Sequence, residues 1–378
     1  MPEPFKNWIN QKLIQDMAFH FKRHWQAFDE KAFTNTACDG LETLELKERT
    51  QRITESMKQY LPADFEQAAE IILKSLGTPL NPDLSGGGIT DEGIAGWGIM
   101  AMVDYVGLYG TEHFDTSMNL FKELTKRSSS EFGIRYFLLA FPEKTLAEMK
   151  KWAMDESLHV RRLASEGSRP RLPWGMRLPL YIEDPRPVIE LLEILKDDET
   201  EYVRRSVANN LNDIAKDHPD LVADIAEKWL KKPDKNRKRM VKHACRTLIK
   251  NGHEKTLQVL GYGKAHIEEA GIAISNKDVL FGTALEFQLS LSSKVSHDQD
   301  LMIDYAIHHQ KANGSTTPKV FKWKITSLKS GKTLKLSKKH AFKPITTRVY
   351  YPGLHKLEVL VNGASVGIVD FELRMEAD

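Results

Sequence analysis

Residues 156–179 read ESLHVRRLASEGSRPRLPWGMRLP, and the rest of the chain can be organised around this stretch. Its first half predicts an amphipathic helix, because Val160, Leu163 and Ala164 follow the i, i+3, i+4 spacing that places apolar side chains on one face. The helix should end at Gly167, since glycine commonly terminates helices and a proline follows three residues later. The opposite face of this helix is charged.

A carboxylate, guanidinium groups and an indole are concentrated in this stretch. Arg162 and Glu166 lie four residues apart and therefore share one helix face. The loop at 168–179 surrounds Trp174 with three arginines and three prolines: Arg169, Arg171, Arg177, Pro170, Pro173 and Pro179. Prolines restrict the backbone, so the loop could hold a cationic ring next to anionic phosphates. The alternatives are a solvated i,i+4 salt bridge and a tryptophan that covers the core.

The pattern around Val160 recurs along the chain. From residue 121 onward the chain repeats short helix pairs, and Val-Arg-Arg begins at Val160 and again at Val203, 43 residues later. A third copy has Val241 at the corresponding place, 38 residues further on. Paired amphipathic helices with this period indicate HEAT-like repeats, which stack into a curved solenoid.

The repeat predicts which polar side chains share a groove. Arg162 and Arg205 occupy equivalent positions, and Arg205, Asn209 and Asp213 rise one turn at a time along one helix face. We therefore expect Glu166 and Asp213 to face the same groove. The alternative for Asp213 is a local ion pair with Arg205.

A third candidate carboxylate lies upstream of these repeats. Glu131 is placed at a helix start, four residues before Arg135, in the segment SSSEFGIRYFLLAF. An acid at a helix N-terminus is also favourable for the helix dipole alone, which is the alternative explanation for Glu131.

After residue 263 the apolar period changes from helical to alternating. Alternation predicts strands, and it is seen at Leu285–Leu291, Leu301–Ile307, Phe321–Ile325 and Leu357–Val361. Ser330-Gly331 and Asn362-Gly363 are typical of two-residue hairpins. The sequence therefore predicts a mainly α chain: a HEAT-like helical-repeat solenoid over 1–275, followed by an immunoglobulin-like β-sandwich over 280–378.

Charge and composition narrow the classes of function. The net charge is only +2, but residues 231–250 carry nine Lys and Arg against one acid, and residues 311–348 carry eleven and no acid. Such concentration indicates a polyanion-binding surface, although lysine-rich strands also protect sheet edges. The two cysteines, Cys38 and Cys245, lack metal-ligand spacing, and no apolar run could cross a membrane. We expect a cytoplasmic protein without a metal site.

Four segments stand out in sequence order: GLETLELKERT (40–50), LASEGSRPRLPW (163–174), HACRTLIKNG (243–252) and HHQKANGSTTPKVFKWKI (308–325). Together they resemble the AlkC branch of the AlkC/AlkD family of bacterial DNA alkylation repair glycosylases. The resemblance covers nearly the whole chain and includes the order of the two domains. One departure lies before HACRTL, where the family often has an aromatic residue and this chain reads NRKRMVK (236–242).

The resemblance implies a monofunctional glycosylase for cationic alkylated bases, chiefly N3-methyladenine and N3-methylcytosine, in double-stranded DNA. It also implies that the enzyme bends the duplex, does not flip the base into a pocket, and needs no cofactor and no obligate protein partner. The implied catalytic residues are Glu131, Glu166 and Asp213, with Trp174 against the sugar or backbone of the lesion. The expected DNA-binding residues are Arg162, Arg169, Arg171, Arg205, Lys242, His243, Arg246, Lys311, Asn313, Lys319 and Lys322. In a bacterium such a protein would work at the nucleoid.

Two other classes stay open. A HEAT-repeat scaffold for protein partners would keep the helices but would give no reason for the eleven unopposed cations. A catalytically inactive DNA-binding protein would keep the basic segments without the chemistry. Release of a free methylated base from a methylated duplex separates these classes from a glycosylase.

Overall fold

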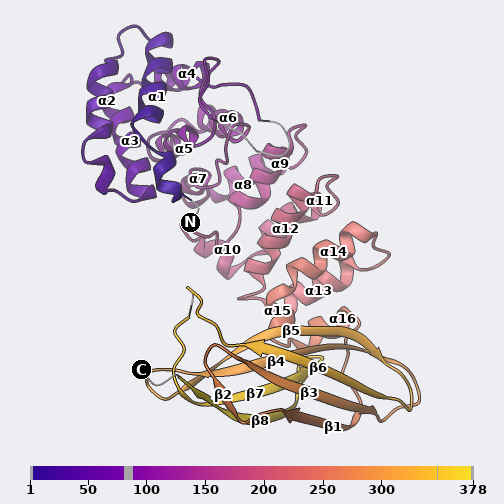
Figure 1. The fold of residues 1–378 in the computed structure, drawn as a ribbon. Helices are drawn as coiled ribbons and strands as arrows, with labels where there is room; N and C mark the ends of the chain where they lie inside the picture. Colours follow the sequence, from indigo (N-terminus) through magenta and orange to yellow (C-terminus); the bar gives the residue numbers. More distant parts are fainter. Residues whose placement is uncertain (1–2, 81–87, 347, 376–378) are drawn as a thin grey trace. The chain divides into compact units, whose positions relative to one another are not determined.

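The computed structural model describes residues 3–80, 88–346 and 348–375, which fall into two compact units (Figure 1). One unit comprises Met1–Asp217 and Asp234–Ala244, and the other comprises His218–Pro233 and Cys245–Asp378. None of the helices in the described residues combines the length and the apolar character that crossing a lipid bilayer needs.

The first unit is built mainly of helices. Its N-terminal half contains η1 (Phe5–Trp8), α1 (Gln11–His24), α2 (Glu30–Cys38), η2 (Leu41–Thr43), α3 (Leu46–Tyr60), α4 (Phe65–Lys74), α5 (Gly98–Tyr109), α6 (Phe114–Thr125) and α7 (Ile134–Ala140). Its second half contains α8 (Pro142–Trp152), α9 (Leu158–Gly167), α10 (Pro179–Glu183), α11 (Arg186–Leu195), α12 (Glu201–Ile214) and α14 (Lys235–Ala244). Polar N-caps start several of these helices, as where the Thr200 hydroxyl accepts from the Val203 amide at the start of α12.

Two of the three predicted helix pairs are present in the order that the repeated motif predicts. Helices α8 and α9 form the first pair and α11 and α12 the second, and α12 packs against both α9 and α14. The predicted apolar stripe of α12 is fully buried, since Val203, Val207, Leu211 and Ile214 are at most 2% exposed. The second helices of successive pairs therefore lie side by side, which brings α9 and α12 into contact.

The second unit joins three helices to a two-sheet sandwich. The helices are α13 (Pro219–Trp229), α15 (Arg246–Lys250) and α16 (Glu254–Val259). The strands are β1 (Ile267–Ile274), β2 (Asp278–Leu280), β3 (Ala284–Ser293), β4 (Gln299–Gln310), β5 (Thr316–Leu328), β6 (Thr333–Ala341), β7 (Gly353–Val361) and β8 (Ala364–Arg374). One sheet has the order β1-β3-β6 and the other β2-β8-β7-β4-β5, antiparallel except where β2 pairs with β8.

Most of the predicted alternation is confirmed, with one exception on β5. The inward residues of β3, β4 and β7 form the core between the sheets, and Trp323 reaches Phe287 on the opposite sheet. A bulge interrupts the pairing of β5 with β4, so that one extra residue stands opposite the step from Ile303 to Asp304. Beyond this bulge Ile325 is about half exposed, which corrects the expectation that it is buried.

The two predicted hairpins have different outcomes. Asn362-Gly363 joins β7 to β8 in one sheet, and both residues have positive φ, as a tight hairpin turn requires. Ser330-Gly331 also forms a turn, but it connects β5 to β6, which belong to different sheets. The hairpin prediction for Ser330-Gly331 is therefore wrong, because turn chemistry alone does not decide which strands pair.

The sandwich begins earlier than the predicted boundary at 275–280. Strand β1 starts at Ile267 and pairs with β3 along its length. Its sequence, IEEAGIAI, hides the alternation because Glu268, Glu269 and Gly271 interrupt it. An edge strand exposes much of its surface and tolerates such residues, so apolar periodicity did not detect it.

Candidate active site

Helix α9 places Arg162 and Glu166 where it crosses α7 and α12. The helix ends at Gly167, as predicted, but the reason for glycine differs from the expected one. Gly167 does not have a positive φ. A Cβ added there would lie 2.7 Å from Cγ2 of the buried Ile134 on α7. Glycine therefore permits a close approach between α9 and α7.

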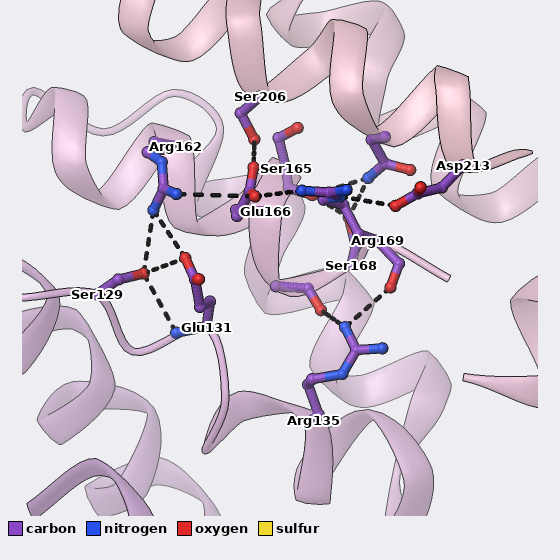
Figure 2. A network of polar contacts seen from close by, with 12 residues as sticks. Ser129, Glu131, Arg135, Arg162, Ser165, Glu166, Ser168, Arg169, Ser206 and Asp213 are labelled. Atoms are coloured by element: carbon purple, nitrogen blue, oxygen red, sulfur yellow. Dashed lines mark hydrogen bonds and ion pairs between the residues drawn. The ribbon is translucent and has the colours of Figure 1, made fainter. Parts of the chain in front are cut away.

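Five charged side chains alternate in sign along the face of α9 (Figure 2). Arg162 Nη1 lies 2.9 Å from Glu131 Oε2, and Arg162 Nη2 lies 3.7 Å from Glu166 Oε1. Arg169 Nη1 donates to Glu166 Oε1 at 2.6 Å, and Arg169 Nε donates to Asp213 Oδ2 at 2.7 Å. The order is acid, base, acid, base, acid, so every charge in this described network has an opposite neighbour.

Glu166 is the buried centre of this network. It is 5% exposed, and Ser206 on α12 donates to its Oε2 at 2.6 Å. Burial by itself would raise the pKa of Glu166, but Arg162, Arg169 and the Ser206 hydroxyl outweigh it and hold the pKa below its ordinary value. The carboxylate therefore stays ionised near neutral pH.

The two arginines beside Glu166, Arg162 and Arg169, are each paired with two carboxylates. Burial would lower the pKa of Arg162, but Glu131 and Glu166 raise it above its ordinary value. The guanidinium also stacks over the Tyr202 ring at 5.1 Å. Arg169 is buried, which would lower its pKa, but Asp213 and Glu166 raise that pKa above its ordinary value. Both cations are paired with carboxylates of the protein, and contact of Arg162 and Arg169 with DNA stays a prediction.

Glu166 and Asp213 do come together, but through Arg169 and not on one open face. Asp213 is 1% exposed and also accepts from Lys216 Nζ at 2.9 Å. Its expected alternative, a local pair with Arg205, is wrong, because Arg205 turns to Glu201 at 3.5 Å and is largely exposed. The alternative of a solvated pair is wrong for Glu166, since that carboxylate is buried.

Arg135 supports the loop and was not predicted. It is fully buried on α7, where Nη1 donates to the carbonyls of Gly167 and Arg169 at 2.9 Å each, and Nε donates to that of Met176 at 2.6 Å. Burial, followed by the neighbouring Arg169, lowers its pKa to about 10. One signal was available in the sequence: Arg135 is the only charged residue in the apolar helix IRYFLLA.

Trp174 projects from this loop into solvent. Its side chain is 69% exposed and its backbone has a φ of 62°, in a region that residues other than glycine rarely adopt. The Lys47 ammonium donates to the Trp174 carbonyl and holds the loop against α3. The alternative that Trp174 covers the core is therefore wrong, and the indole is available to a ligand.

These residues line a cleft of about 660 Å³. Its polar wall consists of Glu45, Lys47, Glu131, Glu166 and Arg169. Its apolar wall consists of Phe5, Leu46, Trp97, Met100, Phe132, Leu172, Pro173 and Trp174. Asp213 does not line the cleft and acts on it through Arg169. The arrangement offers one carboxylate that is held charged, Glu166, beside an aromatic surface, which suits a cationic ligand.

The remaining expected DNA-binding residues have mixed surroundings. Arg171 forms a two-point ion pair with Asp217, at 2.7 Å for both contacts. His243 and Arg246 are partly buried. The exposed ones are Lys242 on α14, Lys311 and Asn313 in the turn between β4 and β5, and Lys322 on β5. Lys319 is half-buried and lies over the Phe321 ring at 5.5 Å. Asn313 has a structural role as well, since its Oδ1 accepts from the Ser315 amide and hydroxyl.

The side chains that commonly ligate metals are dispersed. Within residues 3–80, 88–346 and 348–375, no group of three or more His, Cys, Asp and Glu side chains is arranged to hold a metal ion.

Known proteins match both units. A family model described as "DNA alkylation repair enzyme" matches residues 128–250, and another, described as the C-terminal Ig-like domain of the uncharacterised protein YhaZ, matches residues 268–375. YhaZ of Bacillus subtilis is 37% identical over 370 residues, which covers 97% of this chain and 99% of that protein.

A solved structure matches over the same extent. It is the Pseudomonas fluorescens alkylpurine DNA glycosylase AlkC bound to DNA containing an abasic site analog, with a TM-score of 0.85 and 36% identity. The match covers 98% of this chain and 100% of that chain. The first family match includes Glu131, Glu166 and Asp213, and the second includes most of the sandwich. The chain therefore belongs to the AlkC branch of the AlkC/AlkD family of DNA alkylation repair proteins.

Proposed function

We propose that the protein is a monofunctional DNA glycosylase that hydrolyses the bond between deoxyribose C1′ and a cationic alkylated base in duplex DNA. The expected substrates are N3-methyladenine and N3-methylcytosine, and the expected reaction uses no cofactor and does not flip the base into a pocket. One observation carries the proposal: Glu166 is buried yet held ionised in the wall of a cleft that also presents the exposed Trp174.

The residue types fit this chemistry. An N3-alkylated base already carries a positive charge, so it leaves without prior protonation by a general acid. As the bond breaks, its electron pair goes to the base, and the sugar develops positive charge at C1′. A fixed carboxylate stabilises that charge, as in glycoside hydrolysis. Glu166 suits this role because its neighbours keep it charged throughout.

Water completes the reaction. Its oxygen forms the new bond to C1′, and a carboxylate of the cleft accepts its proton. Glu131 and Glu166 both line the cleft, so the water has two carboxylates within its surroundings. The products are the free base and an abasic sugar in an intact strand.

Contacts to DNA are assigned to the exposed cations and to the tryptophan. Trp174, which is largely in solvent, is suited to lie against the sugar or backbone at the lesion. Lys242, Lys311 and Lys322 are exposed and can neutralise phosphates. A cytoplasmic location at the bacterial nucleoid is part of this proposal.

The decisive experiment incubates the full chain with a methylated duplex and measures release of free 3-methyladenine and 3-methylcytosine. Glu166→Gln and Asp213→Asn should each reduce single-turnover excision by about 10²-fold or more, while duplex affinity changes little. The matched control is Glu70→Gln, which removes an exposed carboxylate paired only with Lys74 on α4.

Two results would contradict the proposal. If the wild type releases no free base, the protein is an inactive DNA-binding member of its family. If both amide variants excise at the wild-type rate, the carboxylates are only structural partners of the arginines.

A further inference from the structure

A second cavity adjoins the cleft in the helical unit. Its volume is about 340 Å³, at the lower end of the range of about 300–1,000 Å³ that is typical of small-molecule sites. Lys47, Met100, Phe132 and Trp174 line both cavities and form the wall between them. The proposed reaction uses none of the residues that belong to the second cavity alone.

Asp104 is the polar centre of this second cavity. It is the only charged residue of α5, and its spacing from Met100 and Leu108 places all three on one face of that helix. Within the described part of the chain, neither a hydrogen bond nor an ion pair holds its carboxylate. Burial raises the pKa of Asp104 to about 6, and Lys47 only partly opposes this. A half-buried acid without a partner is costly to keep and points to a ligand.

Aromatic rings surround this carboxylate. Tyr109, Phe132 and Tyr136 line the cavity, and all three are half-buried. The backbone makes room for one of them: a Cβ at Gly107 would lie 2.5 Å from Cδ2 of Tyr136, so glycine on α5 lets this ring pack there. Tyr136 lines the same cavity as Asp104, and burial, followed by Asp104, raises the pKa of its hydroxyl.

We propose that this second cavity binds the methylated base after its release from DNA, with Asp104 bound to the edge of the base and Tyr136 against its face. The inference rests on the proposed glycosylase function and names the place of its first product. Freed 3-methyladenine and 3-methylcytosine are flat, carry exocyclic amino donors and are basic enough to take up a proton. A carboxylate that itself titrates near neutral pH pairs with such a ring by charge-assisted hydrogen bonds, and the aromatic rings stack on it.

The test is isothermal titration calorimetry of the full chain with free 3-methyladenine, in the absence of DNA. We expect saturable binding with one site. Asp104→Asn should weaken it by about 10- to 100-fold, the value of one hydrogen bond to a charged group. Tyr136→Leu provides a second variant that removes a ring without changing any charge. Unmethylated adenine, which is a weaker base, should bind less tightly than 3-methyladenine.

Two further variants separate this cavity from the cleft. Glu166→Gln alters the cleft alone and should retain the wild-type affinity for free 3-methyladenine. Asp115→Asn, which changes an exposed acid on α6, should retain it too. No saturable binding by the wild type would overturn the inference, and so would weakening by Glu166→Gln without weakening by Asp104→Asn. The proposed function fails separately, when a methylated duplex yields no free base although 3-methyladenine still binds at Asp104.

Discussion

Replacing Arg169 by methionine tests how much one guanidinium stabilises the protein by pairing with two buried carboxylates. Arg169 contacts Glu166 at 2.6 Å and Asp213 at 2.7 Å, and all three side chains are at least 90% buried. Methionine fills similar space but leaves both acids without this cation. Breaking one buried pair costs about 3–5 kcal/mol, because a charge remains in surroundings that solvate it poorly. We therefore expect Arg169→Met to destabilise the helical unit by at least about that amount.

The expected loss corresponds to a large shift in melting temperature. For a unit of this size, about 1 kcal/mol lowers the midpoint by roughly 2–4 °C, so the variant should melt about 6–20 °C below the wild type. Differential scanning calorimetry at pH 7 measures the shift. The matched control is Arg186→Met, since Arg186 forms an exposed surface pair with Asp184 and its loss should leave the melting temperature close to that of the wild type.

The stability difference between wild type and Arg169→Met should depend on pH in a defined direction. In the wild type the pKa of Glu166 is depressed, so its stabilising contribution exists above its unfolded pKa and is lost as pH falls through the folded one. Without Arg169, burial should raise the pKa of Glu166, and its protonation would relieve part of the penalty in acid. The gap between wild type and Arg169→Met should therefore narrow from pH 7 toward pH 4. A variant within about 1 kcal/mol of wild type at pH 7 would refute the reasoning.

Three further predictions concern the reaction, the lysines at 311 and 322, and the stability of the sandwich. Excision should persist in EDTA, because a cationic leaving group needs no Lewis acid. Borohydride should trap no covalent adduct, because the Lys47 ammonium is bound to the Trp174 carbonyl. Loss of activity in EDTA or a covalent adduct would contradict these expectations. Lys311→Gln with Lys322→Gln should lower the salt dependence of duplex binding by a slope of about 0.9 for each phosphate that is no longer neutralised, and an unchanged slope would exclude both lysines. Burial, aided by Arg348, lowers the pKa of His309 to about 3 and of His340 to about 4. Because the unfolded state then binds more protons, the free energy of unfolding of the sandwich should fall by about 2 kcal/mol per histidine between pH 7 and pH 5. His309→Leu should remove about half of the fall that these two histidines cause. Denaturant unfolding at the two pH values measures both.

The sequence predicts the scaffold well because burial follows period. Val203, Val207, Leu211 and Ile214 are buried as the helical spacing requires, and the alternating residues of β3 are buried as strand spacing requires. Periodicity fails where exposure and register interrupt it. The acidic edge strand β1 was assigned to the helical domain, and the bulge on β5 turns Ile325 outward.

The sequence predicted which carboxylates and arginines belong to the candidate site, but it did not predict which of them contact each other. Glu166 and Arg162 are neighbours on one helix, so their proximity follows from spacing. Arg169 reaches Asp213 across 44 positions of sequence, and only the packing of α9 on α12 brings them together. The partners of Arg135 and Ser206 could not be found by spacing for the same reason, since Arg135 holds the loop after α9 and Ser206 on α12 holds Glu166 on α9.

The network explains why a site that needs a charged carboxylate is built from so many buried charges. A lone glutamate placed as deep as Glu166 would become protonated and could not stabilise a cation. Arg162 and Arg169 prevent this, but each would then carry unpaired charge unless Glu131 and Asp213 answered it. Glu166 therefore needs the two arginines to stay ionised, and the arginines in turn need Glu131 and Asp213 to balance their charge. A substitution at Asp213 should therefore act on catalysis through Arg169 and the ionisation of Glu166, although Asp213 itself does not reach the cleft.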